Sequence, residues 1–205
     1  MRQEPVIRPA RPDESEVVAT LLYETAGGMY DLFAGGRERA ARILRAAYAR
    51  EGNSASRETV VLAELDGAVA GAMAAFPVAE GDTRAKAFLR VSLARTPPWR
   101  WPRTLRVFRM GGELTPPAPG DALYVDALAT DPDFRRRGVA SALLRAAENT
   151  ARGAGLNAVA LDTAETNATA QALYESFGFE RSGASRGIGQ IPGAIAYVKK
   201  LTVDS

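Results

Sequence analysis

A run of three arginines followed by a glycine is the segment whose residue types point most directly to chemistry. It is Phe134-Arg135-Arg136-Arg137-Gly138-Val139-Ala140-Ser141, between a predicted strand at 124–129 and a predicted amphipathic helix. The first N–H groups of a helix are unpaired and lie at the positive end of its dipole, so they attract anions. Small residues leave room there, and arginines add charge-assisted hydrogen bonds. The segment predicts a phosphate site, with a solvated basic helix cap as the alternative.

The elements around this segment predict how it is positioned. A helix after Gly138 is indicated by apolar residues three and four apart, with Gly153-Ala154-Gly155 as its stop signal. A strand-like segment follows at 158–163. Strand, basic turn, helix and strand in this order favour parallel neighbours in a sheet, with ligands at the carboxyl ends of the strands.

Two motifs together resemble a known family. Arg135-x-x-Gly138-x-Ala140, preceded by 128–132, resembles the acyl-CoA pyrophosphate loop of the GCN5-related N-acetyltransferases (GNAT). The segment Asn167 to Phe179 resembles that family's Asn-x-x-Ala-x-x-Leu-Tyr-x-x-x-Gly-Phe motif at the expected distance. Gly138 is not followed by the Lys-Ser or Lys-Thr of a P-loop, and no strand is followed by Gly-x-Gly-x-x-Gly, so other nucleotide-loop assignments fit less well.

The resemblance implies a GNAT fold of the α/β (α+β) class. Its central sheet is mixed and mostly antiparallel, contains a parallel pair of strands that splay apart, and is flanked by helices. It also implies acetyl-CoA as the acyl-donor cosubstrate and no metal. The implied cofactor contacts are Leu128, Ala129, Thr130, Arg135, Arg136, Arg137, Gly138, Val139, Ala140, Ser141, Asn167 and Tyr174.

Two residues of the second motif have both a functional and a structural interpretation. The resemblance makes Tyr174 a proton donor to the departing CoA thiolate, but Tyr174 also lies on an apolar helical stripe where its ring could simply be buried. Asn167 is expected to contact the CoA arm, and it is also a favourable N-cap for the helix that follows it.

A catalytic base must come from residues other than histidine and cysteine, because the chain has neither. Asp126 and Asp162 lie in the two predicted strands among apolar neighbours, where partial burial would raise the pKa of a carboxyl group. A structural ion pair or a base that acts through water remains an alternative for each. Glu113 and Asp121 are weaker candidates. Three further residues could bind a cationic acceptor: Glu24, Tyr30 and Asp31.

Composition favours a globular protein in the cytoplasm. Hydrophobic residues make up 46% of the chain, no apolar run is long enough to span a membrane, and residues 1–5 lead into a strand without a secretory leader. The net charge is only +2, which predicts weak long-range attraction to nucleic acid. Neither nucleic acid nor a membrane is an expected partner.

Arginines recur every third residue from Arg100 to Arg109, with Trp101, Leu105 and Phe108 on another helical face. We expect a solvated arginine face over a packed apolar one; a lid or subunit contact and nucleic-acid binding are the alternatives. Residues 78–120 around this helix exceed an ordinary connection and are predicted to be a helical insertion. The whole chain, 1–205, is predicted to be a single domain.

The N-terminal half predicts a strand at 5–9, helices at 13–25 and 37–48, and a hairpin at 60–76 that turns at Asp66-Gly67. Asp13 is the expected cap of the first helix. Late glycines, at 183, 187, 189 and 193, predict a flexible hairpin connection.

The predicted function is acetyl-CoA-dependent N-acetyl transfer to a primary amine of a small molecule, by direct attack on the thioester. A non-catalytic acyl-CoA-binding sensor or partner-binding module is the alternative from another class, and a protein amino-terminal acetyltransferase is the alternative within the enzyme class. The resemblance is compatible with a homodimer. No motif identifies the acceptor.

Overall fold

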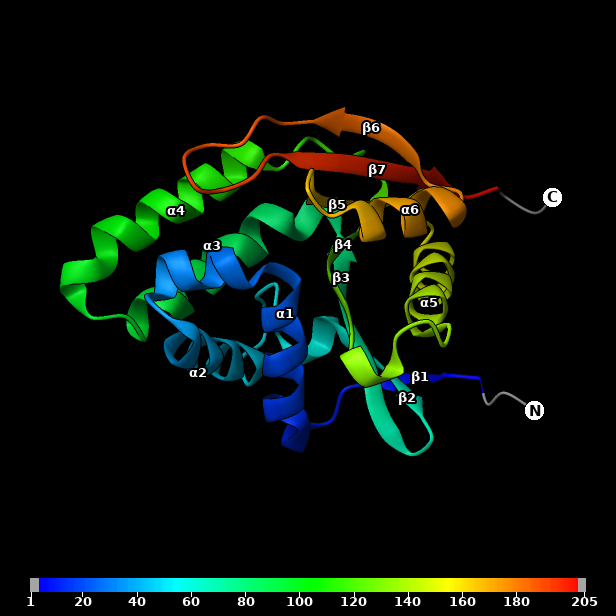
Figure 1. Ribbon diagram of the computed structural model, residues 1–205, viewed down its shortest axis with the longest axis horizontal. Coiled ribbons are helices and arrows are strands. Elements are labelled where there is room, and N and C mark those ends of the chain that lie inside the picture. The colour runs from blue at the N-terminus through cyan, green and yellow to red at the C-terminus, as the bar shows by residue number, and fades with distance from the viewer. Residues whose placement is uncertain (1–3, 203–205) are drawn as a thin grey trace.

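A seven-stranded sheet forms the centre of the molecule in the computed structural model, which describes residues 4–202 (Figure 1). Its order is β1-β2-β3-β4-β5-β7-β6, and every neighbouring pair is antiparallel except β4 and β5. The strands are β1 Val6–Pro9, β2 Val60–Leu65, β3 Ala68–Pro77, β4 Ala122–Thr130, β5 Ala158–Ala164, β6 Glu180–Ala184 and β7 Ala194–Lys200. The mixed, mostly antiparallel sheet with one parallel pair is confirmed.

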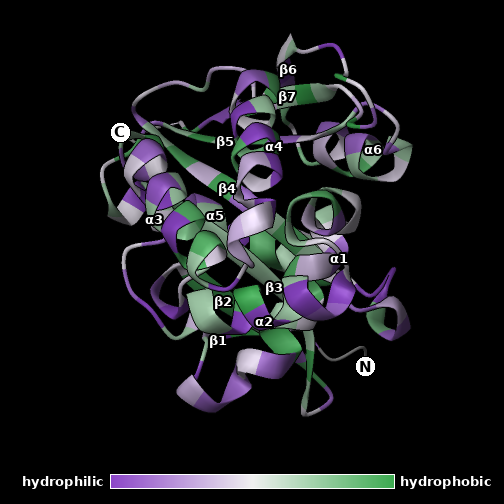
Figure 2. Ribbon diagram, turned by 90° about the vertical axis from the view of Figure 1, so that its left-hand side faces the viewer, coloured by the Kyte–Doolittle hydropathy of each residue, from purple (hydrophilic) through white to green (hydrophobic). Residues whose placement is uncertain are grey.

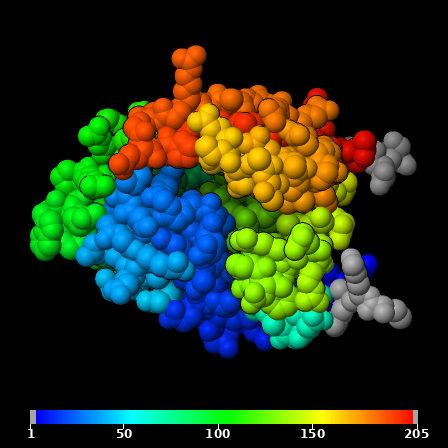
Figure 3. Space-filling model, viewed as in Figure 1, coloured from blue at the N-terminus to red at the C-terminus, as the bar shows by residue number. Residues whose placement is uncertain are grey.

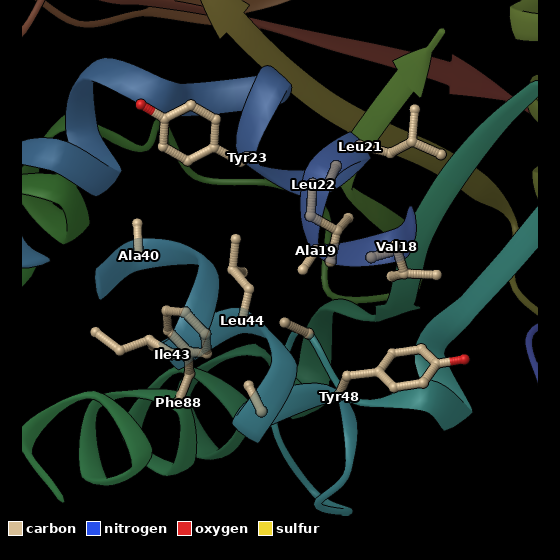
Figure 4. Close-up of a cluster of buried hydrophobic side chains, with 14 of the residues drawn as sticks. Val18, Ala19, Leu21, Leu22, Tyr23, Ala40, Ile43, Leu44, Tyr48 and Phe88 are labelled. Carbon is tan, nitrogen blue, oxygen red and sulfur yellow. The ribbon is translucent and has the colours of Figure 1, made fainter. Parts of the chain in front are cut away.

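Six α-helices are present within residues 4–202. They are α1 Ser15–Ala34, α2 Arg37–Tyr48, α3 Gly81–Ala94, α4 Trp101–Leu114, α5 Val139–Gly153 and α6 Ala168–Ser176. One buried cluster joins α1 and α2 to one face of the sheet, with Leu22, Leu44 and Phe88 among its side chains (Figure 4). A second cluster joins α5 and α6 to the opposite face, with Leu143 and Tyr174 among its members. The sheet is therefore covered on both faces.

The first helix differs from its prediction. It continues to Ala34 rather than ending at residue 25, but Ala26 has a non-helical backbone (φ −151°, ψ 40°) that breaks the helix. Asp13 is not its cap, because Asp13 lies in a short 3-10 turn, and the carboxylate of Glu14 instead accepts a hydrogen bond from the Arg11 N–H at 2.6 Å. The break falls beside Gly27-Gly28, where the low helix propensity of glycine lowers the free energy needed to interrupt the helix.

The segment between β3 and β4 contains the two helices α3 and α4, and its predicted apolar face is partly wrong. Thr104, Val107 and Leu114 are buried, whereas Trp101 and Leu105 are exposed. Phe108, the third residue of the predicted face, is partly buried and packs against Phe33 at a centroid distance of 5.1 Å. The packed face is therefore rotated from the predicted one but includes Phe108. Figure 2 shows the mixed hydropathy of these helices beside the more uniformly hydrophobic central strands.

Other sequence predictions are confirmed at the level of elements. The hairpin of β2 and β3 turns at Asp66-Gly67, and both of those residues have positive φ. Residues 185–193 connect the antiparallel strands β6 and β7 as a hairpin. Residues 1–3 belong to the segment 1–5 for which no secretory leader is predicted, and they lie outside the described residues, as do 203–205. None of the described helices has the length and hydrophobicity needed to cross a membrane.

Candidate active site

The parallel strands β4 and β5 separate in the middle of the sheet. Their last paired residues are Val125 and Leu161. Beyond this point β4 remains paired with β3 as far as Thr130, and β5 remains paired with β7 as far as Ala164. The facing edges of the two strands therefore have no strand partner there, and backbone groups around Leu128 to Thr130 are left open to a ligand.

A β-bulge lies at the point where the strands separate. Ala74 of β3 pairs with Ala127, whereas Ala75 pairs with Val125, so Asp126 is an extra residue in β4. Before the bulge, Leu123 and Val125 belong to the buried cluster that contains α5. After it, Ala127 and Ala129 belong to the cluster that contains α1, although they are odd-numbered too. The bulge therefore reverses which face of the sheet the odd-numbered side chains occupy. This reversal directs Asp126 into the open space rather than into either core.

That space is a cleft of about 600 Å³, within the range of small-molecule sites. The surface is hollowed between the N-terminal helices and the C-terminal segments, and atoms of the sheet are visible at the bottom (Figure 3). Six parts of the chain line the cleft: α1 at 24–29 and Leu32, the end of α4, strand β4, strand β5, α6 with its cap, and the loop 190–193.

Asp126 and Asp162 lie one residue beyond the last strand pair, and both line the cleft. The Asp126 side chain is exposed to water in the cleft, but protein surrounds it on its other sides. This loss of hydration, together with the negative charge of Asp162, raises the pKa of Asp126 to about 7. Asp162 is less exposed and accepts a hydrogen bond from the Tyr124 hydroxyl. Burial raises the pKa of Asp162, while that hydrogen bond opposes the rise.

Tyr174 of α6 lines the same cleft and is 6% exposed. Its ring packs against Phe179 and Tyr197, with centroid distances of 6.0 and 5.7 Å. The structural interpretation of Tyr174 is therefore confirmed, because its ring belongs to the core. The residue also borders the cleft, and its role as a proton donor stays a prediction. Burial and the charge of Asp162 raise the pKa of Tyr174 to about 12, so the phenol keeps its proton throughout the neutral range.

The basic turn lies at the N-terminus of α5, beside the end of β4. Arg136 and Gly138 have positive φ values of 60° and 83°, and no side chain caps the helix. The three arginines are exposed. Arg137 differs from its neighbours because its guanidinium pairs with Asp66 at 2.6 Å. Its side chain is held on the β2–β3 hairpin, while Arg135 and Arg136 have no ion pair among residues 4–202.

The α5 N-terminus is packed closely onto the sheet. A β-carbon added at Gly71 would lie 2.7 Å from both the Ala129 carbonyl oxygen and Val139 Cγ1. Glycine is therefore needed for this close approach. Val139 is buried, and Ala140 and Ser141 are partly buried in the first turn of α5. Their side chains leave the helix end open.

Asn167 caps α6 and also lines the cleft. Its side-chain oxygen accepts a hydrogen bond from the Ala170 N–H at 3.2 Å. The structure thus confirms its capping role and places it beside the splayed strands.

Several other candidates lie away from the cleft. Glu113 is paired with Arg109 at 3.6 Å, and Asp121 accepts a hydrogen bond from Asn157 at 2.9 Å. Asp31 accepts a hydrogen bond from the Tyr23 hydroxyl at 2.9 Å. Tyr30 packs between Tyr23 and Phe33, although the charge of Asp126 contributes to raising its pKa. Of the proposed acceptor contacts only Glu24 lines the cleft.

Sequence reasoning missed Tyr124 and the loop 190–193. Tyr124 lies two residues before Asp126, which places it in the same strand segment as a candidate base. The loop was treated as a flexible connection, but Ile191 is buried and the backbone of Gly193 hydrogen bonds with Glu165. The signal available in the sequence was the large apolar residue Ile191 among the glycines of this loop.

Comparison with known proteins identifies the class. The Acetyltransferase (GNAT) family model matches residues 28–179, so the chain belongs to this family. A crystal structure of an N-acetyltransferase from Staphylococcus aureus Mu50 is similar with a TM-score of 0.73 and 19% identity, over 96% of this chain and all of that one. Another acetyltransferase crystal structure is similar with a TM-score of 0.66 and 22% identity, over 96% and 100% of the two chains.

The curated relatives match over a shorter region. N-acetyltransferase 8 from Homo sapiens is 43% identical over 58 residues, which is 28% of this chain and 26% of the relative. N-acetyltransferase 8B from the same organism is 40% identical over 58 residues, with the same coverage. The match thus spans about a quarter of each curated relative.

Proposed function

We propose that this protein is an acetyl-CoA-dependent N-acetyltransferase that acetylates a primary amine of a small molecule. One observation carries the proposal: Asp126, Asp162 and Tyr174 meet in a cleft where β4 and β5 separate. Family membership supports acyl transfer in general. The arrangement of titratable groups supports transfer to an amine, which needs a base at one position and a proton donor at another.

The residues present fit acetyl-CoA. The uncapped N-terminus of α5 and the exposed Arg135 and Arg136 would hold the pyrophosphate. The open edge of β4 at 128–130 would hold the pantetheine arm through backbone hydrogen bonds. Acetyl-CoA supplies the activated acetyl group. The chain's own contribution is to position that group and to manage two protons.

Asp126 is the better candidate for the base. Its raised pKa arises from burial and charge, whereas Asp162 is already engaged by the Tyr124 hydroxyl. A carboxylate with a pKa of about 7 can accept a proton from an ammonium group near neutral pH. Asp162 then acts as a positioning residue that keeps negative charge beside Asp126. Tyr174 holds a proton at its Oη for the leaving group, since its pKa is raised to about 12.

The size and enclosure of the cleft support a small acceptor. The end of α4, the loop 190–193 and the broken region of α1 all contribute walls to the cleft. Leu114 and Ile191 in these walls are buried, so they pack into the protein as well as border the cleft. A cleft of about 600 Å³ suits a small molecule.

Tyr174→Phe tests the proposal. Loss of the donor should lower kcat by roughly 10² to 10⁴ while leaving acetyl-CoA affinity nearly unchanged. Tyr197→Phe is the matched control, because the Tyr197 ring packs edge-on against Tyr174 but its hydroxyl donates a hydrogen bond to Glu175 rather than pointing to the cleft. CoA release with an amine panel measures kcat, and calorimetry measures affinity. Unchanged kcat in Tyr174→Phe would remove Tyr174 from the mechanism, and acetyl-CoA binding without transfer to any amine would indicate a sensor.

A further inference from the structure

The cleft is acidic, although the whole chain has a net charge of +2. Of the residues 4–202, those that line the cleft include three carboxylates, Glu24, Asp126 and Asp162, and no lysine or arginine. Glu24 is partly neutralised by Arg37, whose nitrogen lies 3.2 Å away. Asp126 and Asp162 have no cationic partner among these residues. A positively charged group is therefore favoured at the bottom of the cleft, and a negatively charged one is repelled.

Four large apolar side chains are among the residues that line the cleft with these acids. Met29 and Leu32 follow the break in α1, Leu114 ends α4, and Ile191 lies in the loop between β6 and β7. The two helices approach each other closely, since a β-carbon added at Gly111 would lie 3.6 Å from Met29 Sδ. An acceptor would thus meet hydrocarbon walls once its amine had reached the acids. A second charged group on the acceptor would have to lose water against these side chains, and the one further carboxylate, Glu24, is already paired with Arg37.

Two arginines lie in a groove beside the cleft rather than in the cleft itself. Arg103 and Arg106 line a neighbouring groove together with Leu32, Gln190 and Ile191. Leu32 and Ile191 lie between that groove and the acids. The Arg103 guanidinium donates a hydrogen bond to the Leu32 carbonyl oxygen at 3.1 Å, which holds it at the rim. A carboxylate bonded to the same carbon as the reacting amine would therefore meet no arginine among the residues that line the cleft.

We propose that the acceptor is a primary amine with an uncharged apolar body and no anionic group beside the amine, such as an arylalkylamine. This inference rests on the proposed acetyltransferase function and specifies its substrate class. The ammonium group would pair with Asp126, lose its proton there, and attack as the neutral amine. The body would pack against Met29, Leu32 and Ile191. Amino acids are rejected by the repulsion between their carboxylate and the two aspartates.

Matched acceptors test the carboxylate directly. 2-Phenylethylamine, phenylalanine and phenylalanine methyl ester share the same ring and amine, and only phenylalanine carries the negative charge. We expect kcat/KM for 2-phenylethylamine to exceed that for phenylalanine by at least about 100-fold, because like charges in such a site cost several kcal/mol. The methyl ester should recover most of the loss. Spermidine, with further cations, should be poorer than 2-phenylethylamine.

A charge placed at the rim provides a second test. Gln190 is exposed and lines both the cleft and the neighbouring groove, so Gln190→Lys adds a cation without disturbing the core. This variant should narrow the preference for 2-phenylethylamine over phenylalanine by about fivefold or more. Asn149→Lys is the matched control, because Asn149 is an exposed residue of α5 outside the cleft. It should leave the preference unchanged.

Failure of this inference is distinguishable from failure of the proposed function. Similar kcat/KM values for 2-phenylethylamine and phenylalanine, or a higher value for spermidine, would overturn the acceptor class while leaving the acetyltransferase intact. Equal effects of Gln190→Lys and Asn149→Lys would overturn the role of cleft charge. Acetyl-CoA binding with no transfer to any of the four amines would instead refute the proposed function.

Discussion

The charge of Asp162 should raise the pH at which the enzyme becomes active, in addition to the larger effect of burial on Asp126. The two carboxylates lie one residue beyond the last pair of β4 and β5. Neighbouring strands are about 4.8 Å apart, and these strands diverge, so a charge separation of ~6 Å is reasonable. At that separation the repulsion is about 0.7 kcal/mol in water and ~3 kcal/mol at an effective dielectric constant of 20. These energies correspond to a rise of about 0.5 to 2 units in the pKa of Asp126.

Asp162→Asn removes this charge while keeping an oxygen that can accept the Tyr124 hydroxyl. With both substrates saturating, kcat of the wild type should rise with pH and level off above an apparent pKa of about 7. In Asp162→Asn the same transition should move down by about 0.5 to 2 units, toward the lower figure if water remains in the cleft. The assay is CoA release in buffers of constant ionic strength from pH 5 to 9.

Asp126→Asn identifies the group that titrates. This variant should lose the pH transition and lower kcat by roughly 10² to 10⁴, because the base is gone. If Asp162→Asn left the transition at the wild-type pH, the charge coupling between the two residues would be refuted. If Asp126→Asn kept the transition and Asp162→Asn abolished it, the assignment of the base would be reversed.

Three further predictions concern the stability of the cleft and the phosphate turn. The pKa of Asp126 is raised in the folded state, so ionisation of Asp126 disfavours folding as pH rises from about 4 to 7. After a discount for water in the cleft, Asp126→Asn should raise the free energy of unfolding at pH 8 by about 1 kcal/mol, or Tm by about 2–4 °C. At pH 4 the substitution should leave stability unchanged. A Tm difference independent of pH would contradict this. Gly138→Val should greatly weaken acetyl-CoA binding in calorimetry. Gly155 has a similar φ and open surroundings, so the control variant Gly155→Val should carry the same backbone strain and bind acetyl-CoA normally. Equal affinities of the two variants would exclude the turn as the cofactor site. Asp66→Asn should release Arg137 and strengthen acetyl-CoA binding at low salt by about two- to fivefold, and an unchanged Kd would leave Arg137 outside the site.

The sequence was sufficient for the part of the molecule around α5 and α6, where we propose that the cofactor binds, because local rules determine that part. The helix after Gly138 follows from an apolar repeat and a glycine stop signal, and the cap of α6 follows from the residue type of Asn167. The parallel pairing of β4 and β5 follows from the strand–helix–strand order. These features depend on residues close together in the chain.

The acceptor half depended on contacts between distant segments. The bulge at Asp126 exists only relative to β3, so the phase of the strand could not be read from β4 alone. The face of α4 that is buried was mistaken because Trp101 and Leu105 are large and apolar, whereas Thr104 is buried by a hydrogen bond to the Phe33 carbonyl oxygen. A buried threonine satisfied by a distant backbone leaves no apolar signal in the sequence.

One geometric feature, the separation of β4 from β5, serves both halves of the proposed reaction. If the strands remained paired, the backbone groups of 128–130 would be used by the sheet and could not hold a ligand. The same pairing would bring Asp126 and Asp162 side by side within a continuous sheet, where the negative charge of one carboxylate would strongly raise the pKa of the other. Separation leaves a backbone edge for the cofactor and admits water, and then an ammonium group, to the acids. In the proposed reaction, the position of the cofactor and the base strength of Asp126 therefore both depend on the separation of β4 from β5. A substitution that keeps these two strands paired should impair both together.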